Sequence, residues 1–294
     1  MARRKEPTVH GVAVVDKPAG VTSHDVVAML RRRLNERRIG HAGTLDPSAT
    51  GVLVIGVGHA TRLLRFITDG HKRYVGEVVL GVETDSLDAD GTVTATHEMA
   101  PVDLDTVRAL IADRFVGDIE QVPPMVSAIK IGGRRLHELA RAGVEVERQP
   151  RPVTISSFDV IDSRVEDGRQ ILTVDVACSA GTYVRSLAAD LGTALGGGAH
   201  LRNLRRTAVE PFTLDDAAPP DECELLPIVD AVRGMPQFTV DGPLAARVAV
   251  GSVLPAPPGD GPWAMVTPDR QLLAVYEAHG DGFAKPSVVL PQPS

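Results

Sequence analysis

The residue best placed to do chemistry is a lone carboxylate, Asp46, in the stretch Arg38–Gly51, which reads RIGHAGTLDPSATG. Three glycines in this stretch allow backbone conformations that other residues avoid. Pro47 disfavours a helical conformation for Asp46, and the apolar run Val52–Ile55 predicts a buried strand directly afterwards. We therefore expect no regular structure between Arg38 and Gly51, but a stiff loop that holds Asp46 at the start of a core strand.

This carboxylate has two interpretations. An Asp-Pro pair in a glycine-rich loop is most often a turn, in which the aspartate accepts hydrogen bonds from its own backbone. The alternative is a catalytic carboxylate mounted on a stiff loop, and local chemistry alone favours the turn. Glycoside hydrolysis requires two carboxylates that flank the bond. The stretch supplies only Asp46, so we exclude that chemistry.

Basic residues gather around the same part of the chain, although all 294 residues together carry a net charge of −7. Residues 1–74 hold 13 Lys and Arg against 6 Asp and Glu, whereas residues 210–294 hold 4 against 12. Charges more than about 10 Å apart are largely screened at physiological salt, so local density governs phosphate binding. The arginines at 31–33, 37 and 38 either complement a helix dipole or contact phosphates. The net charge therefore does not exclude an RNA partner.

Periodicity and turn signals predict the elements that position these residues. A buried strand is expected at 11–16, followed by a helix from about Ser23 to Asn35. Thr22 and Ser23 are both candidate N-caps, and Asp25 is the capping-box partner of Thr22. Further along the chain we expect helices at 60–68, 104–115 and 183–195, a strand at 72–81 and a hairpin over 153–176. The basic segment 130–151, with glycines around a short helix at 137–141, is either a mobile flap that closes on a polyanion or a solvated surface hairpin.

The C-terminal quarter differs in composition from the rest. Residues 216–236 are acidic and rich in proline, which predicts a linker with one short helix at 224–232. Short β-like runs at 238–240, 248–250, 263–266 and 272–276 are separated by Gly and Pro turns. They indicate a small β-barrel.

Several classes of protein and site are excluded. No apolar stretch approaches the roughly 18 residues of a membrane helix, and the basic start has no apolar core of a signal peptide, so we expect a cytoplasmic protein. Cys178 and Cys223 have no metal or redox spacing. The stretch 56–61 lacks the third glycine of a dinucleotide loop, and 84–91 lacks the later glutamate of a calcium loop. We expect neither a metal nor a cofactor.

Beyond these local features, ordered motifs covering roughly residues 9–210 carry a family resemblance. Arg38–Gly51 fits G-H-x-G-x-L-D-P-x-A-x-G at every fixed position, and residues 16–23 fit D-K-P-x-G-x-T-S. Lys72-Arg73-Tyr74 fits K-x-Y, and residues 181–185 fit G-T-Y-I/V-R. Residues 121–130 and 199–207 also match. The chain resembles the TruB-type tRNA pseudouridine synthases.

The resemblance implies an α+β fold, in which a mixed, largely antiparallel central sheet is flanked by helices and followed by a small PUA-like β-barrel. It implies a catalytic domain at 1–215 with an insert at about 83–151, which includes a mobile RNA-binding segment at 130–151. A linker at 216–236 and a small β domain at 237–294 complete the expected organisation. The small domain is unusually short and acidic for an RNA-binding barrel.

The implied activity is isomerisation of uridine 55 in the T loop of tRNA to pseudouridine, with the base flipped out of the RNA. Asp46 is the expected catalytic residue, as nucleophile or base. Arg185 would ionise and orient it, Tyr74 would stack on the uracil, and His41 would fill the vacated place in the loop, unless it is simply a structural loop residue. Tyr183, Leu204 and Lys17 would support the pocket. The expected RNA-binding residues are His41, Arg38, Lys72, Arg73, Lys130, Arg134, Arg205 and Arg206.

Two alternatives stay open at this point. One is a non-catalytic protein that binds or folds tRNA through the same surface. The other is a dyskerin-like synthase that depends on a guide RNA and partner proteins. The TruB-type interpretation expects the T stem-loop of tRNA as partner, no obligatory protein partner, and a monomer.

Overall fold

The computed structural model describes residues 6–127, 130–131, 134–135, 144 and 146–292. The chain divides into two compact units. The first unit consists of residues 1–47, 51–70 and 209–294, and the second of residues 48–50 and 71–208. Each is described by itself.

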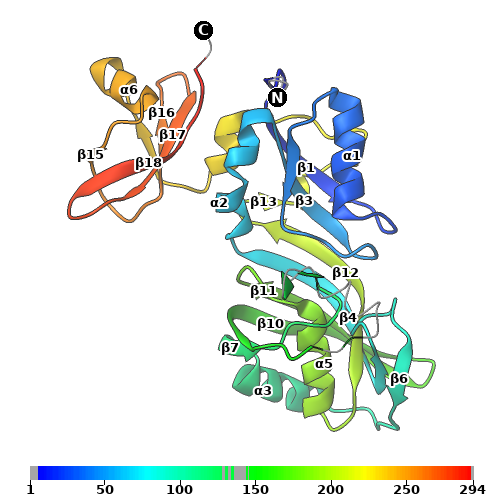
Figure 1. The fold of residues 1–294 in the computed structure, drawn as a ribbon. Coiled ribbons are helices and arrows are strands. Elements are labelled where there is room, and N and C mark those ends of the chain that lie inside the picture. Colours follow the sequence, from blue (N-terminus) through cyan, green and yellow to red (C-terminus); the bar gives the residue numbers. More distant parts are fainter. Residues whose placement is uncertain (1–5, 128–129, 132–133, 136–143, 145, 293–294) are drawn as a thin grey trace. The chain divides into compact units, whose positions relative to one another are not determined.

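The first unit is built around β1 (Gly11–Lys17) and β3 (Thr50–Val57), which pair antiparallel with Gly11 opposite Val57 and Lys17 opposite Gly51. Helix α1 (Ser23–Leu34) lies beside β1 (Figure 1) and has the predicted capping box, in which Thr22 and Asp25 satisfy each other's backbone N–H groups. The 3₁₀ helix η1 (Gly58–Arg62) and α2 (Leu64–Thr68) follow β3. The single helix expected at 60–68 is therefore two short ones.

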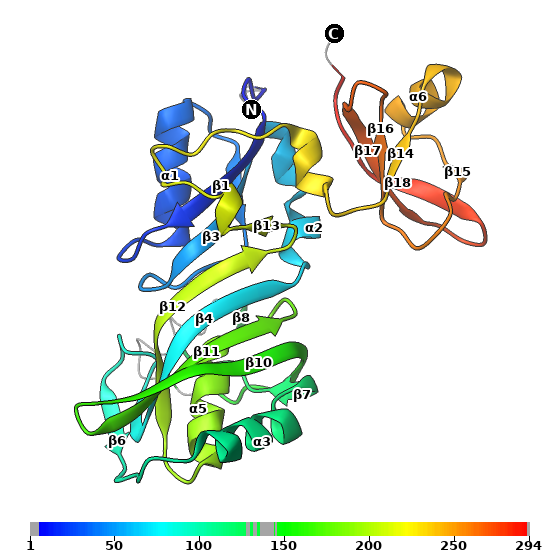
Figure 2. The ribbon, with the colours of Figure 1, turned by 180° about the vertical axis from the view of Figure 1, so that it is seen from behind.

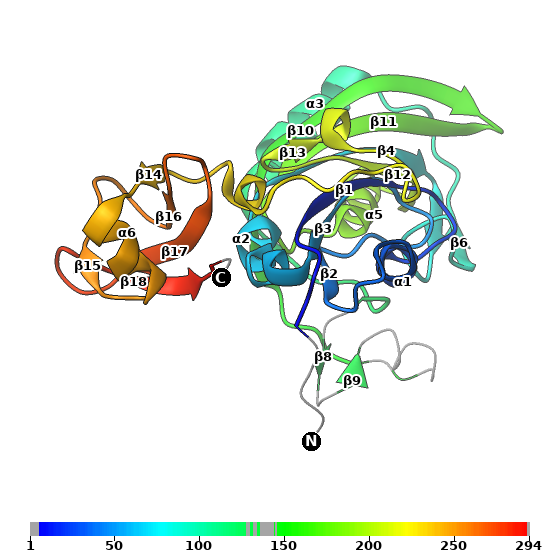
Figure 3. The same ribbon diagram turned by 90° about the horizontal axis from the view of Figure 1, so that it is seen from above.

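The expectation of no regular structure in the stretch 38–51 is wrong for its first part. Strand β2 (Ile39–Ala42) pairs antiparallel with β3, with His41 opposite Ile55, and contacts α1 (Figure 3). Ile39 and Ala42 are buried. Gly40 permits close packing here, because a Cβ at that position would lie 3.3 Å from Leu64 Cδ1. Residues 43–49 form the expected irregular loop.

The segment expected as a linker hydrogen-bonds along β1. Val12 and Leu226 exchange both backbone hydrogen bonds, and Ala218 bonds to the backbones of Val14 and Asp16. The expected helix at 224–232 is only the 3₁₀ helix η3 (Ile228–Val232). Before it come β13 (Phe212–Thr213) and the 3₁₀ helix η2 (Leu214–Asp216).

The C-terminal sheet has the hydrogen-bonded order β14-β16-β17-β18-β15. Its strands are β14 (Gln237–Thr239), β15 (Leu254–Pro255), β16 (Trp263–Val266), β17 (Leu272–Ala278) and β18 (Phe283–Val289). The sheet is curled, as expected for a PUA-like domain (Figures 1 and 3). The β prediction at 248–250 is wrong, because this stretch lies at the end of α6 (Gly242–Ala249), which has Pro243 in its first turn. Val248 packs from that helix into the core of the sheet.

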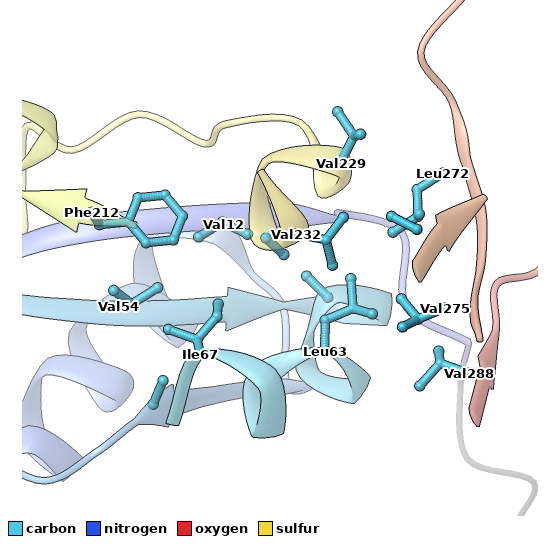
Figure 4. Close-up of a cluster of buried hydrophobic side chains, with 14 of the residues drawn as sticks. Val12, Val54, Leu63, Ile67, Phe212, Val229, Val232, Leu272, Val275 and Val288 are labelled. Carbon is cyan, nitrogen blue, oxygen red and sulfur yellow. The ribbon is translucent and has the colours of Figure 1, made fainter. Parts of the chain in front are cut away.

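One apolar cluster joins the C-terminal sheet to the rest of the first unit. Figure 4 shows Leu272, Val275 and Val288 of this sheet close to Leu63 and Val232 of the short helices. Arg65 adds a 2.7 Å ion pair with Glu277. The C-terminal sheet is therefore packed against the unit rather than only tethered to it.

The second unit contains a sheet with the order β12-β4-β11-β10-β7 (Figure 2). Its strands are β4 (Lys72–Leu80), β7 (Gly117–Gln121), β10 (Arg151–Glu166), β11 (Arg169–Cys178) and β12 (Ala199–Val209). The pairs β4–β11, β10–β11 and β10–β7 are antiparallel, which confirms the predicted hairpin. The helices α3 (Leu104–Arg114) and α5 (Val184–Ala194) lie beside it, so the predicted α+β class is confirmed.

Smaller elements complete the second unit. Strands β5 (Val82–Thr84) and β6 (Val93–Thr96) pair with each other, as do β8 (Lys130–Ile131) and β9 (Arg134–Arg135). The helix predicted at 137–141 lies outside the described residues, so the flap remains a prediction. None of the helices in the described part of the chain is long and apolar enough to cross a membrane.

Candidate active site

The loop that carries Asp46 is clamped on both sides of this residue. On the N-terminal side, Ser23 Oγ donates to the carbonyl of Leu45 at 3.1 Å and accepts from the Leu45 N–H at 2.8 Å. On the C-terminal side, the carbonyl of Pro47 accepts from the Gly20 N–H at 2.9 Å and from Lys17 Nζ at 3.1 Å. Asp46 itself is half-buried. The clamp limits the movement of its backbone in either direction.

Lys17 has a structural explanation in this clamp. Its side chain is fully buried, and Nζ also donates to the carbonyls of Pro18 at 2.9 Å and Val21 at 2.7 Å. A buried ammonium group requires such partners because desolvation is costly. Lys17 thereby ties the 16–23 turn to the Asp46 loop, and its role in supporting the pocket stays a prediction.

The second unit brings Tyr74 and Leu204 to one face of its sheet. Tyr74 is 8% exposed on β4, opposite Val176 of β11. Gly76 lies on the same face because alternate residues of a strand share a face. A Cβ on Gly76 would lie 3.2 Å from Leu201 Cδ1 and 3.4 Å from Leu204 Cδ1, so these two leucines occupy the space over this glycine. An apolar surface next to an aromatic ring suits a flat base.

Arg185, at the start of α5, is a buried guanidinium that connects three parts of the second unit. Its NH1 and NH2 groups donate to the carbonyls of Ser86 and Val126, both at 2.8 Å. NH1 also lies 3.4 Å from Asp88 Oδ2. Asp88 and Arg185 are therefore held together within this unit. The pairing of Arg185 with Asp46, which belongs to the first unit, stays a prediction.

Gln121 fixes the backbone of Tyr183, a predicted pocket residue that lies two positions before Arg185. The Gln121 side-chain amide accepts from the Tyr183 N–H at 2.7 Å and donates to the Tyr183 carbonyl at 3.1 Å. Ser186 Oγ donates to the Val122 carbonyl at 3.2 Å. These bonds, with that from Arg185 to Val126, hold residues 121–126 against the N-terminus of α5.

The predicted RNA-binding residues differ in exposure. Arg73 is exposed and forms a 2.8 Å ion pair with Asp175, whose hydrogen bond and charge raise the pKa of Arg73. Arg205 NH1 lies 3.3 Å from Thr50 Oγ1. Lys72 and Arg206 are 7% and 1% exposed, and their part in RNA binding stays a prediction.

The other predicted RNA-binding residues are His41, Arg38, Lys130 and Arg134. His41 is half-buried on β2, and Arg38 is exposed immediately before this strand. The side chains of Lys130 and Arg134 lie outside the described residues. No group of three or more potential metal ligands occurs among the residues that the structure describes.

The sequence-based analysis missed Ser23, Gln121 and Asp88 as site residues. Ser23 lies inside a matched motif but looked like an alternative helix cap. Each of these three residues contacts a residue that is distant in the sequence, so no local sequence pattern identifies it.

Comparisons with known proteins give consistent results. The model of the TruB family pseudouridylate synthase N-terminal domain matches residues 31–184, and that of the tRNA pseudouridylate synthase B C-terminal domain matches residues 185–223. A tRNA pseudouridine synthase B of Streptomyces coelicolor is 46% identical, covering 94% of this chain and 95% of the relative. That of Symbiobacterium thermophilum is 50% identical over 84% of each.

Solved structures also resemble the chain. A structure described as an H/ACA ribonucleoprotein bound to a substrate RNA containing 2′-deoxyuridine includes a chain with a TM-score of 0.67 and 26% identity. The match covers 91% of the present chain and 78% of that one.

Proposed function

Because the chain belongs to the TruB family of pseudouridylate synthases, we propose that it converts uridine 55 in the T loop of tRNA to pseudouridine, with Asp46 as catalytic residue. That the chain is a tRNA pseudouridine synthase follows from the family and its near-full-length relatives. The observation that best supports the role of Asp46 is the clamp formed by Lys17, Gly20 and Ser23 on either side of it.

The reaction breaks the N-glycosidic bond from C1′ to N1 of uracil, rotates the base, and forms a bond from C1′ to C5. The proton on C5 is lost and N1 gains one, so the reaction is an isomerisation with no redox change. One carboxylate is sufficient for this chemistry. Three roles are open to Asp46: attack on C1′, attack on C6, or abstraction of the C2′ proton. Each role requires a carboxylate held within reach of the nucleoside, and the clamp would hold Asp46 in this way.

The other site residues support binding of the base. A base in a folded T loop must leave its stack before it reaches a carboxylate, at a cost of a few kcal/mol. Tyr74 and Leu204 provide an apolar and aromatic surface for the flipped uracil. Arg185 is proposed to keep Asp46 ionised, and His41 to stack within the RNA loop that the base has left.

The alternatives are an RNA-binding protein without catalysis and a synthase that depends on guide RNA. The comparison chain in the H/ACA ribonucleoprotein is the observation that raises the second. The tRNA pseudouridine synthase B of Streptomyces coelicolor, which matches over 95% of its own length, favours the guide-independent enzyme. We propose that the chain acts as a monomer on tRNA in the cytoplasm.

Mapping of pseudouridine in an unmodified tRNA transcript tests this function. The purified protein is incubated with the transcript alone, and modified positions are read by carbodiimide labelling and primer extension. We expect one modified position, 55, and none in a transcript with cytidine there. Modification at another position, or only after a guide RNA is added, would overturn the proposal.

A further inference from the structure

Two histidines are stacked at the surface of the first unit, away from the Asp46 loop. The rings of His10, just before β1, and His59, in η1, have centroids 4.2 Å apart and planes inclined by 17°. The backbone N–H of His59 donates to the ring atom Nδ1 of His10 at 3.3 Å. Gly58 has φ +60°, and a Cβ on it would lie 2.3 Å from His10 Nδ1 and 2.2 Å from the Val9 carbonyl. Only glycine permits this close approach.

An arginine is fixed beside this stack. Arg38 Nε donates to Thr61 Oγ1 at 3.2 Å, and Thr61 Oγ1 donates to the Gly58 carbonyl at 2.7 Å. The Gly58 N–H donates back to the Arg38 carbonyl at 2.7 Å. Arg38 and His10 are both exposed, and His59 is half-buried. The same short segment of η1 therefore positions both the stack and the guanidinium.

Burial and neighbouring charges disfavour the protonated form of His59. Burial lowers the pKa of His59, and the positive charges of His10, Arg38 and Arg62 lower it further, while Glu6 acts in the opposite direction. The neighbouring carboxylate, Glu36, is buried and accepts from the backbone N–H groups of Thr8 and Arg38. The exposed Arg38 guanidinium, held beside the two imidazole rings, is therefore the charged group of this cluster that an anion from outside the protein would meet.

We propose that His10, Arg38 and His59 form a phosphate-binding surface for the RNA backbone, an interaction that rests on the proposed function. Arg38 directly precedes β2, and the Asp46 loop begins after its other end. At about 3.3 Å per residue, the four steps from Arg38 to Ala42 span roughly 13 Å. The surface would therefore contact the RNA backbone away from the target nucleotide.

The test is a salt titration of RNA affinity with the full-length protein. The double variant His10→Gln/Arg38→Gln is compared with His279→Gln/Arg270→Gln, in which both residues are exposed and belong to the acidic C-terminal part of the chain. We expect the first variant to bind a T stem-loop about tenfold more weakly at physiological salt. The slope of log K against log[salt] should fall by about one per lost phosphate contact.

Turnover separates this proposal from the proposed function. The loss of turnover in the double variant should be largest at subsaturating RNA, because a lost phosphate contact weakens binding of the substrate. Arg38→Lys should keep most of the salt slope, and thermal unfolding verifies that each variant is folded. Affinity and slope equal to those of the control would overturn the phosphate-binding surface even if the enzyme modifies uridine 55. Loss of affinity in a protein without synthase activity would leave the surface intact and overturn the function.

Discussion

Replacement of Ser23 by alanine tests how much catalysis depends on the clamp around Asp46. The serine hydroxyl is buried and makes two hydrogen bonds, both to the backbone of Leu45, the residue before Asp46. Alanine leaves the Leu45 N–H and carbonyl without that partner. A buried polar group without a partner costs about 1–3 kcal/mol. We therefore expect a loss of about 2 kcal/mol in unfolding free energy and, at 2–4 °C per kcal/mol, a Tm lower by about 4–8 °C.

The effect on rate is expected to exceed the effect on stability. A displacement of about 1 Å in a reacting group costs up to about 100-fold in rate, and each 1.36 kcal/mol of barrier is tenfold. Ser23→Ala should thus lower kcat by about 10- to 100-fold while KM changes by less than about threefold. The assay is tritium release from tRNA labelled at uridine C5, at a temperature where the variant is folded.

Thr22→Ala is the matched control. Thr22 caps the same helix one residue earlier, is exposed, and makes its side-chain bonds to Asp25 instead of the catalytic loop. Its loss should cost about 1 kcal/mol of stability and leave kcat unchanged. If Ser23→Ala and Thr22→Ala have the same kcat, the clamp does not position Asp46 and the reasoning is refuted.

Three further predictions concern other parts of the molecule. Gln121→Leu removes both side-chain bonds to the backbone of Tyr183 and should lower kcat together with the Tm; wild-type turnover would show that this contact is not needed for the site. Val275→Ala, in the apolar cluster that joins the C-terminal sheet to the rest of the first unit, should destabilise the protein by about 2 kcal/mol in urea unfolding, whereas Val250→Ala, 80% exposed, should be neutral. Burial raises the pKa of the Cys178 thiol to about 11, so iodoacetamide at pH 8 should label it only in denaturant; rapid native labelling would contradict this.

Helix-capping residues and hydrophobic alternation in the sequence predicted two of the elements. The helix at Ser23 was predicted from Thr22 and Asp25, and the structure has their capping box. The hairpin of β10 and β11 was predicted from alternation. By contrast, β2 was missed because a Gly- and His-containing tetrapeptide has low strand propensity. It is a strand because β3 provides hydrogen-bond partners and the space over Gly40 admits Leu64.

The candidate site was predictable where motifs matched and unpredictable where contacts are distant in sequence. Asp46, Tyr74 and Arg185 were identified from motifs. Ser23 hydrogen-bonds to Leu45, 22 residues away in the sequence, and Gln121 hydrogen-bonds to Tyr183, 62 residues away. Hydrophobic periodicity does not indicate either contact. Lys72 and Arg206 are expected RNA-binding residues from the family resemblance, and their burial is a tertiary property that no motif indicates.

Single-turnover tritium release by Asp46→Asn tests the central claim most directly. The substitution keeps the size of the side chain and removes its charge, and Asp69→Asn, an exposed aspartate of the same unit, is the control. If Asp46 performs the chemistry, its variant should bind tRNA with wild-type affinity and lose at least about 10³-fold in rate, while the control keeps the wild-type rate. Release by Asp46→Asn within tenfold of wild type would contradict the account.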